Sequence, residues 1–155
     1  MDADPTAGQT DDAEADAVAD PTGWAEVAAP DAEVITQLAR ATLATLPAPY
    51  QAAAAELALR VVDFAPDDLL DELGIEDAYD LSGLYSGIPL TERSVAAQPQ
   101  QPDAIWLFRR AILDEWAARG DVALGDLVAN VMVHELAHHF GWTDTQIAAI
   151  DRWWE

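Results

Sequence analysis

The segment VMVHELAHHFGWTDTQ, residues 131–146, decides how this chain folds and what chemistry it can carry. It holds all three histidines of the protein, His134, His138 and His139. His134 and His138 are four positions apart and Glu135 follows the first, which is the HExxH pattern. Residues four apart lie on one face of a helix, so both imidazoles can reach one metal ion. Glu135 is turned by about 100° around the helix, so its carboxylate can lie beside the ion and act as a general base.

The residues on both sides of this pattern predict a buried helix over 122–140. Apolar side chains occupy most of its positions, and a helix that is apolar nearly all round is buried. Unpaired polar groups in the interior are costly, so the histidines and the glutamate predict a bound cation with an open, wet side. Asp121 is a candidate N-cap, and Gly141 suits the left-handed residue that ends a helix, with Trp142 available for the hydrophobic contact that follows.

The chain beyond Gly141 offers a further metal ligand. Thr143 and Gln146 form a capping-box pattern, which predicts a last helix over 144–153. Because the chain can fold back through Gly141, the start of that helix can face the metal-binding turn, and Asp144 is then the candidate third ligand. Glu155 is the competing ligand.

Three protein ligands and one open position typify catalytic zinc, whereas structural zinc is closed by four ligands that usually include cysteine. This chain has no cysteine. His139 points one helical step away from His138, so we interpret it as a neighbour of the site or a surface residue rather than a ligand. We interpret Tyr85, Trp106 and Trp142 as core aromatics rather than substrate contacts.

The charge of the chain excludes some classes of partner. Its 155 residues contain 29 acidic residues against seven arginines and no lysine, which gives a formal net charge of −22. Nucleic acid and anionic membranes need basic surface, so neither is expected as a partner. No apolar run approaches the roughly 20 residues of a membrane span. The N-terminus has no signal-peptide pattern, and a cytoplasmic location is expected.

Composition divides the chain into a tail and one domain. Residues 1–30 combine low hydrophobicity with negative charge and are expected to form a disordered acidic tail, which would keep the protein in solution or bind a cationic partner. Residues 31–155 are expected to form the domain.

Asp31 is a plausible cap for a helix ending before Pro47, and Pro66 and Gly74 bound a short helix. Further predictions are a helix or turn over 50–55, strands over 84–88 and 104–108, a loop over 91–101 and a helix over 112–119; residues 57–64 fit helix or strand.

The sequence HELAHHFGWTDTQI resembles the small bacterial zincin-like metallopeptidases, whose signature is HExxHxxGxxD, commonly with a second histidine and a phenylalanine before the glycine. Three upstream segments are also similar to that family: VVDFAP (61–66) to its strand-to-proline segment, LYSGIPLTER (84–93) to its glycine-containing hairpin, and PDAIWLFRR (102–110) to its next strand. The resemblance covers roughly residues 31–154 and favours a strand over 57–64.

The resemblance implies a single α+β domain in which a short mixed sheet packs on the active-site helix, followed by a C-terminal helix. It also implies Zn²⁺ as the metal and peptide hydrolysis as the reaction. Zinc held by His134, His138 and Asp144 would lower the pKa of its bound water to about 7, and Glu135 would take the proton of that water. Tyr85 or Arg93 could add an oxyanion donor, which the sequence does not decide.

The expected protein is therefore a zinc metallopeptidase that acts as a monomer on a peptide or protein substrate. The substrate could lie along an exposed edge strand formed by residues 104–108. Two alternatives stay open at this point. One is a metal-binding interaction module without turnover, and the other is a zinc hydrolase of a non-peptide amide.

Overall fold

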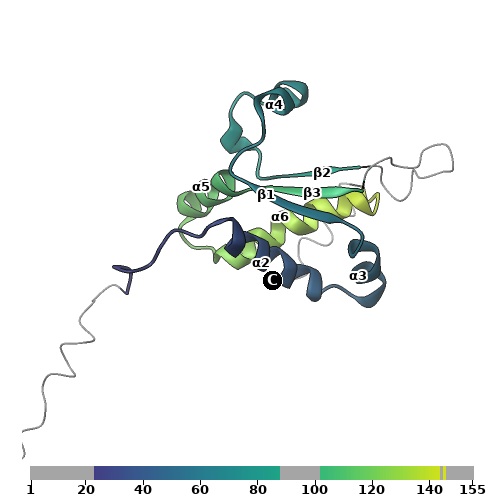
Figure 1. The fold of residues 1–155 in the computed structure, drawn as a ribbon, viewed down its shortest axis with the longest axis horizontal. Helices are drawn as coiled ribbons and strands as arrows, with labels where there is room; N and C mark the ends of the chain where they lie inside the picture. Colours follow the sequence, from purple (N-terminus) through teal and green to yellow (C-terminus); the bar gives the residue numbers. More distant parts are fainter. Residues whose placement is uncertain (1–22, 88–101, 144, 146–155) are drawn as a thin grey trace, which may run out of the picture.

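The computed structural model describes residues 23–87, 102–143 and 145, and these form an α+β fold, as predicted (Figure 1). The predicted strands and most predicted helices within these residues are confirmed, with small shifts of their ends. In chain order the elements are α2 Ala32–Ala44, α3 Ala48–Ala54, β1 Ala58–Val62, α4 Asp67–Leu73, the short 3-10 helix η1 Ala78–Asp80, β2 Gly83–Ser86, β3 Ala104–Phe108, α5 Arg109–Arg119 and α6 Leu124–His139.

Three strands form a mixed sheet in the order β1-β3-β2. β1 pairs with β3 in parallel, and β2 pairs with β3 antiparallel, with Leu84 opposite Trp106. The expectation that residues 104–108 form an exposed edge is wrong, because β3 is the central strand. Its residues Ile105, Leu107 and Phe108 are almost fully buried, as expected of a strand covered on both faces. In the described part of the sheet, β2 is the edge strand nearer to α6.

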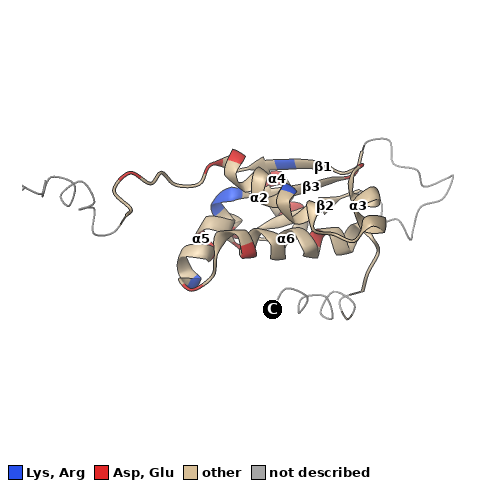
Figure 2. Cartoon of the chain, turned by 90° about the horizontal axis from the view of Figure 1, so that it is seen from below, with Lys and Arg blue, Asp and Glu red and all other residues tan. Residues whose placement is uncertain are grey.

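Helices cover the two faces of the sheet unequally. α6 and α2 pack on one face, whereas α4 lies on the other side of the sheet (Figure 1). Figure 2 shows the sheet and α6 as separate layers from a second direction. Side chains of a strand alternate between faces, so Ile105 and Leu107 join a core with Met132 and Leu136 of α6. Burial of each such side chain contributes about 1.5–3 kcal/mol, which fixes α6 against the sheet.

The second core cluster lies on the α4 side. Phe108 and Leu70 are buried there, and Trp106 and Leu84 pack against them, partly exposed. The interpretation of Trp106 as a core aromatic is thus confirmed.

Several predicted helix ends are confirmed. The carboxylate of Asp31 accepts a hydrogen bond of 3.0 Å from the backbone N–H of Val34 and caps α2. Gly74 ends α4 in the left-handed conformation, with φ 71°. The predicted start of α6 at residue 122, capped by Asp121, is wrong, because the helix begins at Leu124 without a side-chain cap.

The indole of Trp116 gives a physical reason for the later start of α6. Its Nε1 donates a hydrogen bond of 2.8 Å to the carbonyl of Val122 and holds that residue in the connection before the helix. α5 also differs from its prediction. It begins at Arg109, directly after β3, rather than at residue 112.

Some predictions fall outside the described residues. These are the tail up to residue 22, the loop over 91–101 and the last helix, with both candidate third ligands, Asp144 and Glu155. In the part that is described, no helix combines the length and the hydropathy needed to span a membrane.

Candidate metal centre

α6 has a buried face and a face that opens to a pocket. Leu127, Val128, Met132 and Leu136 are buried, but His134 and Glu135 are only partly buried and His138 is exposed. The prediction of a helix buried nearly all round is therefore wrong for this stripe, since the polar side chains face solvent-accessible space instead of the core.

The three side chains of the HExxH pattern share one pocket. His134, Glu135 and His138 line a cavity of about 300 Å³, together with Asp80, Glu115 and Arg119 among others. The two imidazoles come from successive turns of α6, and the carboxylate comes from between them in sequence. The structure thus brings together the predicted base and the two predicted histidine ligands.

The side chain of Glu135 extends from α6 toward β2. Burial raises the pKa of its carboxyl, and the charge of His138, a backbone hydrogen bond from Tyr85 and the charge of His134 act in the opposite direction. β2 can pass this close to the helix because residue 83 is a glycine. A Cβ at Gly83 would lie 2.7 Å from Cγ1 of Val131 and 3.3 Å from Cγ of Glu135.

The turn that ends α6 brings the following residues to the site. Gly141 has φ 73° and donates a hydrogen bond of 3.0 Å to the carbonyl of His138, and Trp142 donates one of 2.9 Å to that of Ala137. This pair of bonds is a Schellman motif, so the predicted role of Gly141 is confirmed. The ring of Trp142 packs on Tyr50 and Phe140, at centroid distances of 5.5 and 5.3 Å. Gly141 and Trp142 therefore line one cavity with Glu135 and His138.

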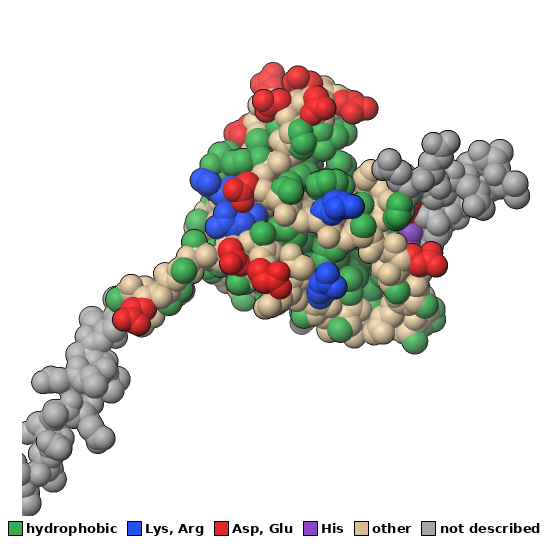
Figure 3. Space-filling view, in the orientation of Figure 1, with side chains coloured by type: hydrophobic (Ala, Val, Ile, Leu, Met, Phe, Trp, Pro, Cys, Tyr) green, Lys and Arg blue, Asp and Glu red, His purple; other side chains and the backbone are tan. Residues whose placement is uncertain are grey.

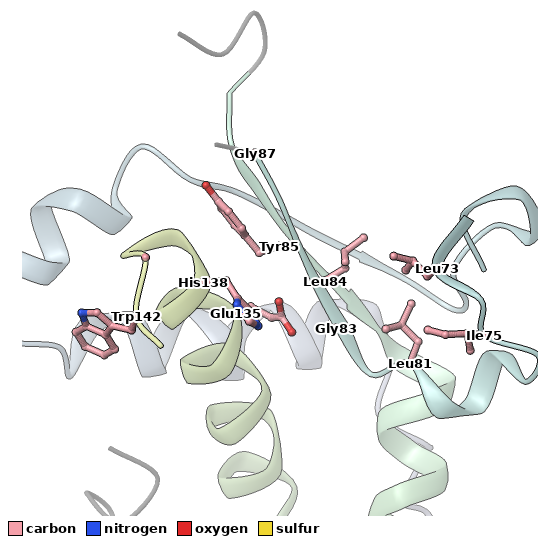
Figure 4. Close-up of a pocket in the computed structure, with 11 residues that line it drawn as sticks. Leu73, Ile75, Leu81, Gly83, Leu84, Tyr85, Gly87, Glu135, His138 and Trp142 are labelled. Atoms are coloured by element: carbon pink, nitrogen blue, oxygen red, sulfur yellow. The ribbon is translucent and has the colours of Figure 1, made fainter. Parts of the chain in front are cut away.

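A second cavity of about 690 Å³ extends from the site along β2 (Figure 4). Tyr85 and Trp142 line it, so their interpretation as core residues is incomplete. Its full lining is Leu73, Ile75, Leu81, Gly83, Leu84, Tyr85, Gly87, Glu135, His138, Gly141 and Trp142.

The donors present fit zinc. Imidazole nitrogen and carboxylate oxygen are ligands that zinc takes, and the pocket leaves room for an open coordination position. Within residues 23–87, 102–143 and 145, no three metal-binding side chains form a group. The predicted third ligand, Asp144, lies outside that set.

The comparison with family models decides the family. The model of the zincin-like metallopeptidases matches residues 54–154, about two thirds of the chain. The chain belongs to the zincin-like metallopeptidases. Membership indicates a zinc-dependent peptidase, as the family resemblance implied. A search of curated proteins gave no match.

This zincin-like metallopeptidase has a buried polar network that the sequence did not predict. Nδ1 of His139 lies 3.1 Å from Oδ2 of Asp103, and the hydroxyl of Tyr85 donates a hydrogen bond of 2.5 Å to the same oxygen. His139 and Asp103 are only 2% and 4% exposed. The interpretation of His139 as a surface residue is wrong, and its alternative, a neighbour of the site, agrees with the structure.

The network joins the strands of the zincin-like domain to the turn of α6 that carries His138. Tyr85 lies on β2, Asp103 directly precedes β3, and His139 is the last residue of α6. The only local signal was Asp103 next to a strongly apolar strand. Nothing in a single sequence pairs it with a histidine 36 positions later.

Proposed function

We propose that this chain hydrolyses peptide bonds with a zinc ion held by His134, His138 and Asp144, and with Glu135 as the general base. The observation that supports this most is that His134, Glu135 and His138 line one open pocket beside the edge strand β2. The ion, when bound, would act as a Lewis acid toward the substrate carbonyl and lower the pKa of a coordinated water to about 7.

Glu135 is suited to moving the proton. Its partial burial favours the protonated form, so the carboxylate takes up a proton more readily than an exposed glutamate would. It would accept a proton from the attacking water and pass it to the nitrogen of the leaving amine. The backbone N–H of Tyr85 holds the carboxylate at the edge of β2 during this transfer.

The edge of β2 offers a place for the substrate backbone. Phe108 donates its N–H to the carbonyl of Ser82 at 2.9 Å, so the alternate residues Gly83 and Tyr85 direct their backbone groups away from β3. An extended peptide can add to such an edge by main-chain hydrogen bonds, here with the backbone groups of Gly83 and the carbonyl of Tyr85, since the N–H of Tyr85 is bonded to Glu135. Because Tyr85 also contacts Glu135, a peptide on this edge would pass beside the proposed base. We therefore assign the substrate to β2 instead of residues 104–108.

Peptide turnover with and without zinc tests this function. The full chain, stripped of metal with a chelator and then reloaded with zinc, is incubated with a mixed-sequence peptide library, and mass spectrometry identifies new peptide ends. Cleavage that appears with zinc and disappears with the chelator is expected. A zinc-loaded protein that binds peptides without cutting any of them would instead support the interaction module.

A further inference from the structure

The larger cavity lies on both sides of the β2 edge. Glu135 and His138 line it on the side of α6, and a group of apolar side chains lines it on the other side (Figure 4). We call this group the leucine patch: Leu73, Ile75, Leu81 and Leu84. A strand added to β2 would direct successive side chains to opposite faces of the sheet. One side chain would point toward the proposed catalytic groups and the next toward the leucine patch.

The leucine patch is accessible. Leu73 is 44% exposed, although leucine is usually buried, and the other three members are only partly buried. Ile75, Leu81 and Leu84 pack against the core around Leu70 and Phe108, and this packing holds the patch in place. A fixed apolar surface of this kind can bind a large apolar side chain.

Carboxylates border the leucine patch. A neighbouring cavity of about 490 Å³ shares Ile75 with it and is lined by Asp67, Asp71 and Glu76. The segment 67–80 contains seven acidic residues and no lysine or arginine. All seven are exposed. Figure 3 shows the acidic side chains of α4 directly above hydrophobic ones. The occupant that complements this surface carries positive charge beside its apolar side chain.

We propose that the cavity binds an extended peptide segment in which a large apolar residue and a lysine or arginine stand two positions apart, so that both side chains point to the leucine-patch side. This inference rests on the proposed function, since it assumes a peptide paired with β2, and it names the class of substrate. The apolar side chain packs on the leucine patch, and the basic side chain reaches the carboxylates of Asp71 and Glu76. Acidic peptides are repelled by the same rim.

Peptide binding to zinc-loaded Glu135→Gln protein, which is expected not to cut the probe, tests the inference. The probe is a fluorescein-labelled peptide containing Leu-Phe-Arg-Lys. One matched peptide has Ser-Ser in place of Leu-Phe, and another has Gln-Gln in place of Arg-Lys. Fluorescence anisotropy is expected to show binding weakened about tenfold by the first change and about fivefold by the second. Added salt should reduce the difference in affinity between the probe and the Gln-Gln peptide, and it should leave the difference between the probe and the Ser-Ser peptide unchanged.

Variants of the full chain locate the two effects. Leu73→Ser should remove most of the preference for Leu-Phe, and Asp71→Asn with Glu76→Gln should remove most of the preference for Arg-Lys. Val34→Ser and Glu56→Gln are matched controls, because Val34 is 39% exposed and Glu56 is an exposed carboxylate. The controls should leave both preferences unchanged.

Other outcomes overturn the inference. Equal binding of the three peptides, or equal effects of the control variants, would show that the patch and its rim do not select the substrate. A wild-type dimer that becomes a monomer in Leu73→Ser would show that a second copy covers the patch. Equal cleavage of all three peptides by the wild-type protein would refute this inference but leave the peptidase function intact. If the zinc-loaded wild-type protein binds the probe selectively but cleaves none of the peptides, the result would support the inference and refute the peptidase function.

Discussion

Nδ1 of His139 lies 3.1 Å from Oδ2 of Asp103 in the interior of the domain. The contact joins the last turn of α6 to the start of β3, and the hydroxyl of Tyr85 reaches both side chains. His138, the neighbour of His139 in sequence, is exposed to the pocket. One turn of helix thus places one histidine toward solvent and anchors the next in the core.

The first prediction concerns this anchor. Asp103→Ala removes the acceptor shared by the partly buried hydroxyl of Tyr85 and the buried imidazole of His139. The free energy of unfolding of the metal-free chain should fall by about 3 kcal/mol, measured by urea denaturation. Asp63→Ala is the control. Its carboxylate pairs with Arg109 but is 60% exposed, so the loss should stay below about 1 kcal/mol. Equal losses in the two variants would show that the network does not anchor the turn.

The second prediction concerns the close approach of β2 to α6. In Gly83→Ala the new methyl group would lie 2.7 Å from Cγ1 of Val131, so strand or helix must move. Overpacking of this kind costs about 1–3 kcal/mol, and peptide turnover should fall because Glu135 is displaced from the edge of β2.

Gly125→Ala is the matched control for that substitution. Gly125 lies in α6, and its added Cβ would meet only Cδ2 of Leu38 at 3.6 Å, an ordinary contact. Alanine should stabilise the helix by about 0.5–1 kcal/mol without changing turnover. Thermal unfolding and an activity assay on both variants separate the two cases. A Gly83→Ala protein as stable and active as Gly125→Ala would contradict the packing described for the β2 edge.

The third prediction distinguishes the two adjacent histidines. His138→Ala should lose the zinc ion, expected at about one per chain, and the rise in melting temperature that zinc gives. Its metal-free stability should change by less than about 0.5 kcal/mol, because His138 is exposed. His139→Gln should do the opposite, lowering metal-free stability while keeping the zinc. Elemental analysis and melting curves with and without zinc measure both effects. Zinc retained at full affinity in His138→Ala would exclude that residue as a ligand.

The fourth prediction concerns the third ligand. Asp144→Asn should weaken zinc binding, measured by competition with a chromophoric chelator, without unfolding the metal-free domain. Glu155→Gln is the control, since Glu155 is the other carboxylate that the sequence offers. A loss of affinity in Glu155→Gln and not in Asp144→Asn would reverse the assignment.

Local patterns in the sequence were sufficient to predict the elements that form the site. HExxH placed His134, Glu135 and His138 on one helix, and Gly141 marked its end, because both signals act within one or two turns. The strand over 104–108 was predicted from its β-prone residues. The short helix between Pro66 and Gly74 was bounded by residues with fixed backbone preferences.

Contacts between residues far apart in the sequence were harder to predict. The pairing of Ala58 with Ala104 makes β3 central, and it joins residues 46 positions apart. A signal existed, because the uninterrupted apolar run of β3 is typical of a strand covered on both faces. The network of Tyr85, Asp103 and His139 gave no signal for the pairing of its members, since three separate segments supply them. The open face of α6 was also predicted wrongly as buried. His134 and His138 are one helical turn apart and share that face, but apolar residues occupy most of the other positions of the helix.

The central claim is that Glu135 moves the proton and does not hold the metal. The most direct test is the kcat/KM of zinc-loaded Glu135→Gln for a peptide that the wild-type chain cleaves, measured alongside its zinc content. We expect kcat/KM to fall by about a hundredfold or more, with the zinc content unchanged. Peptide cleavage at the wild-type rate, or loss of the zinc from this variant, would contradict this role of Glu135.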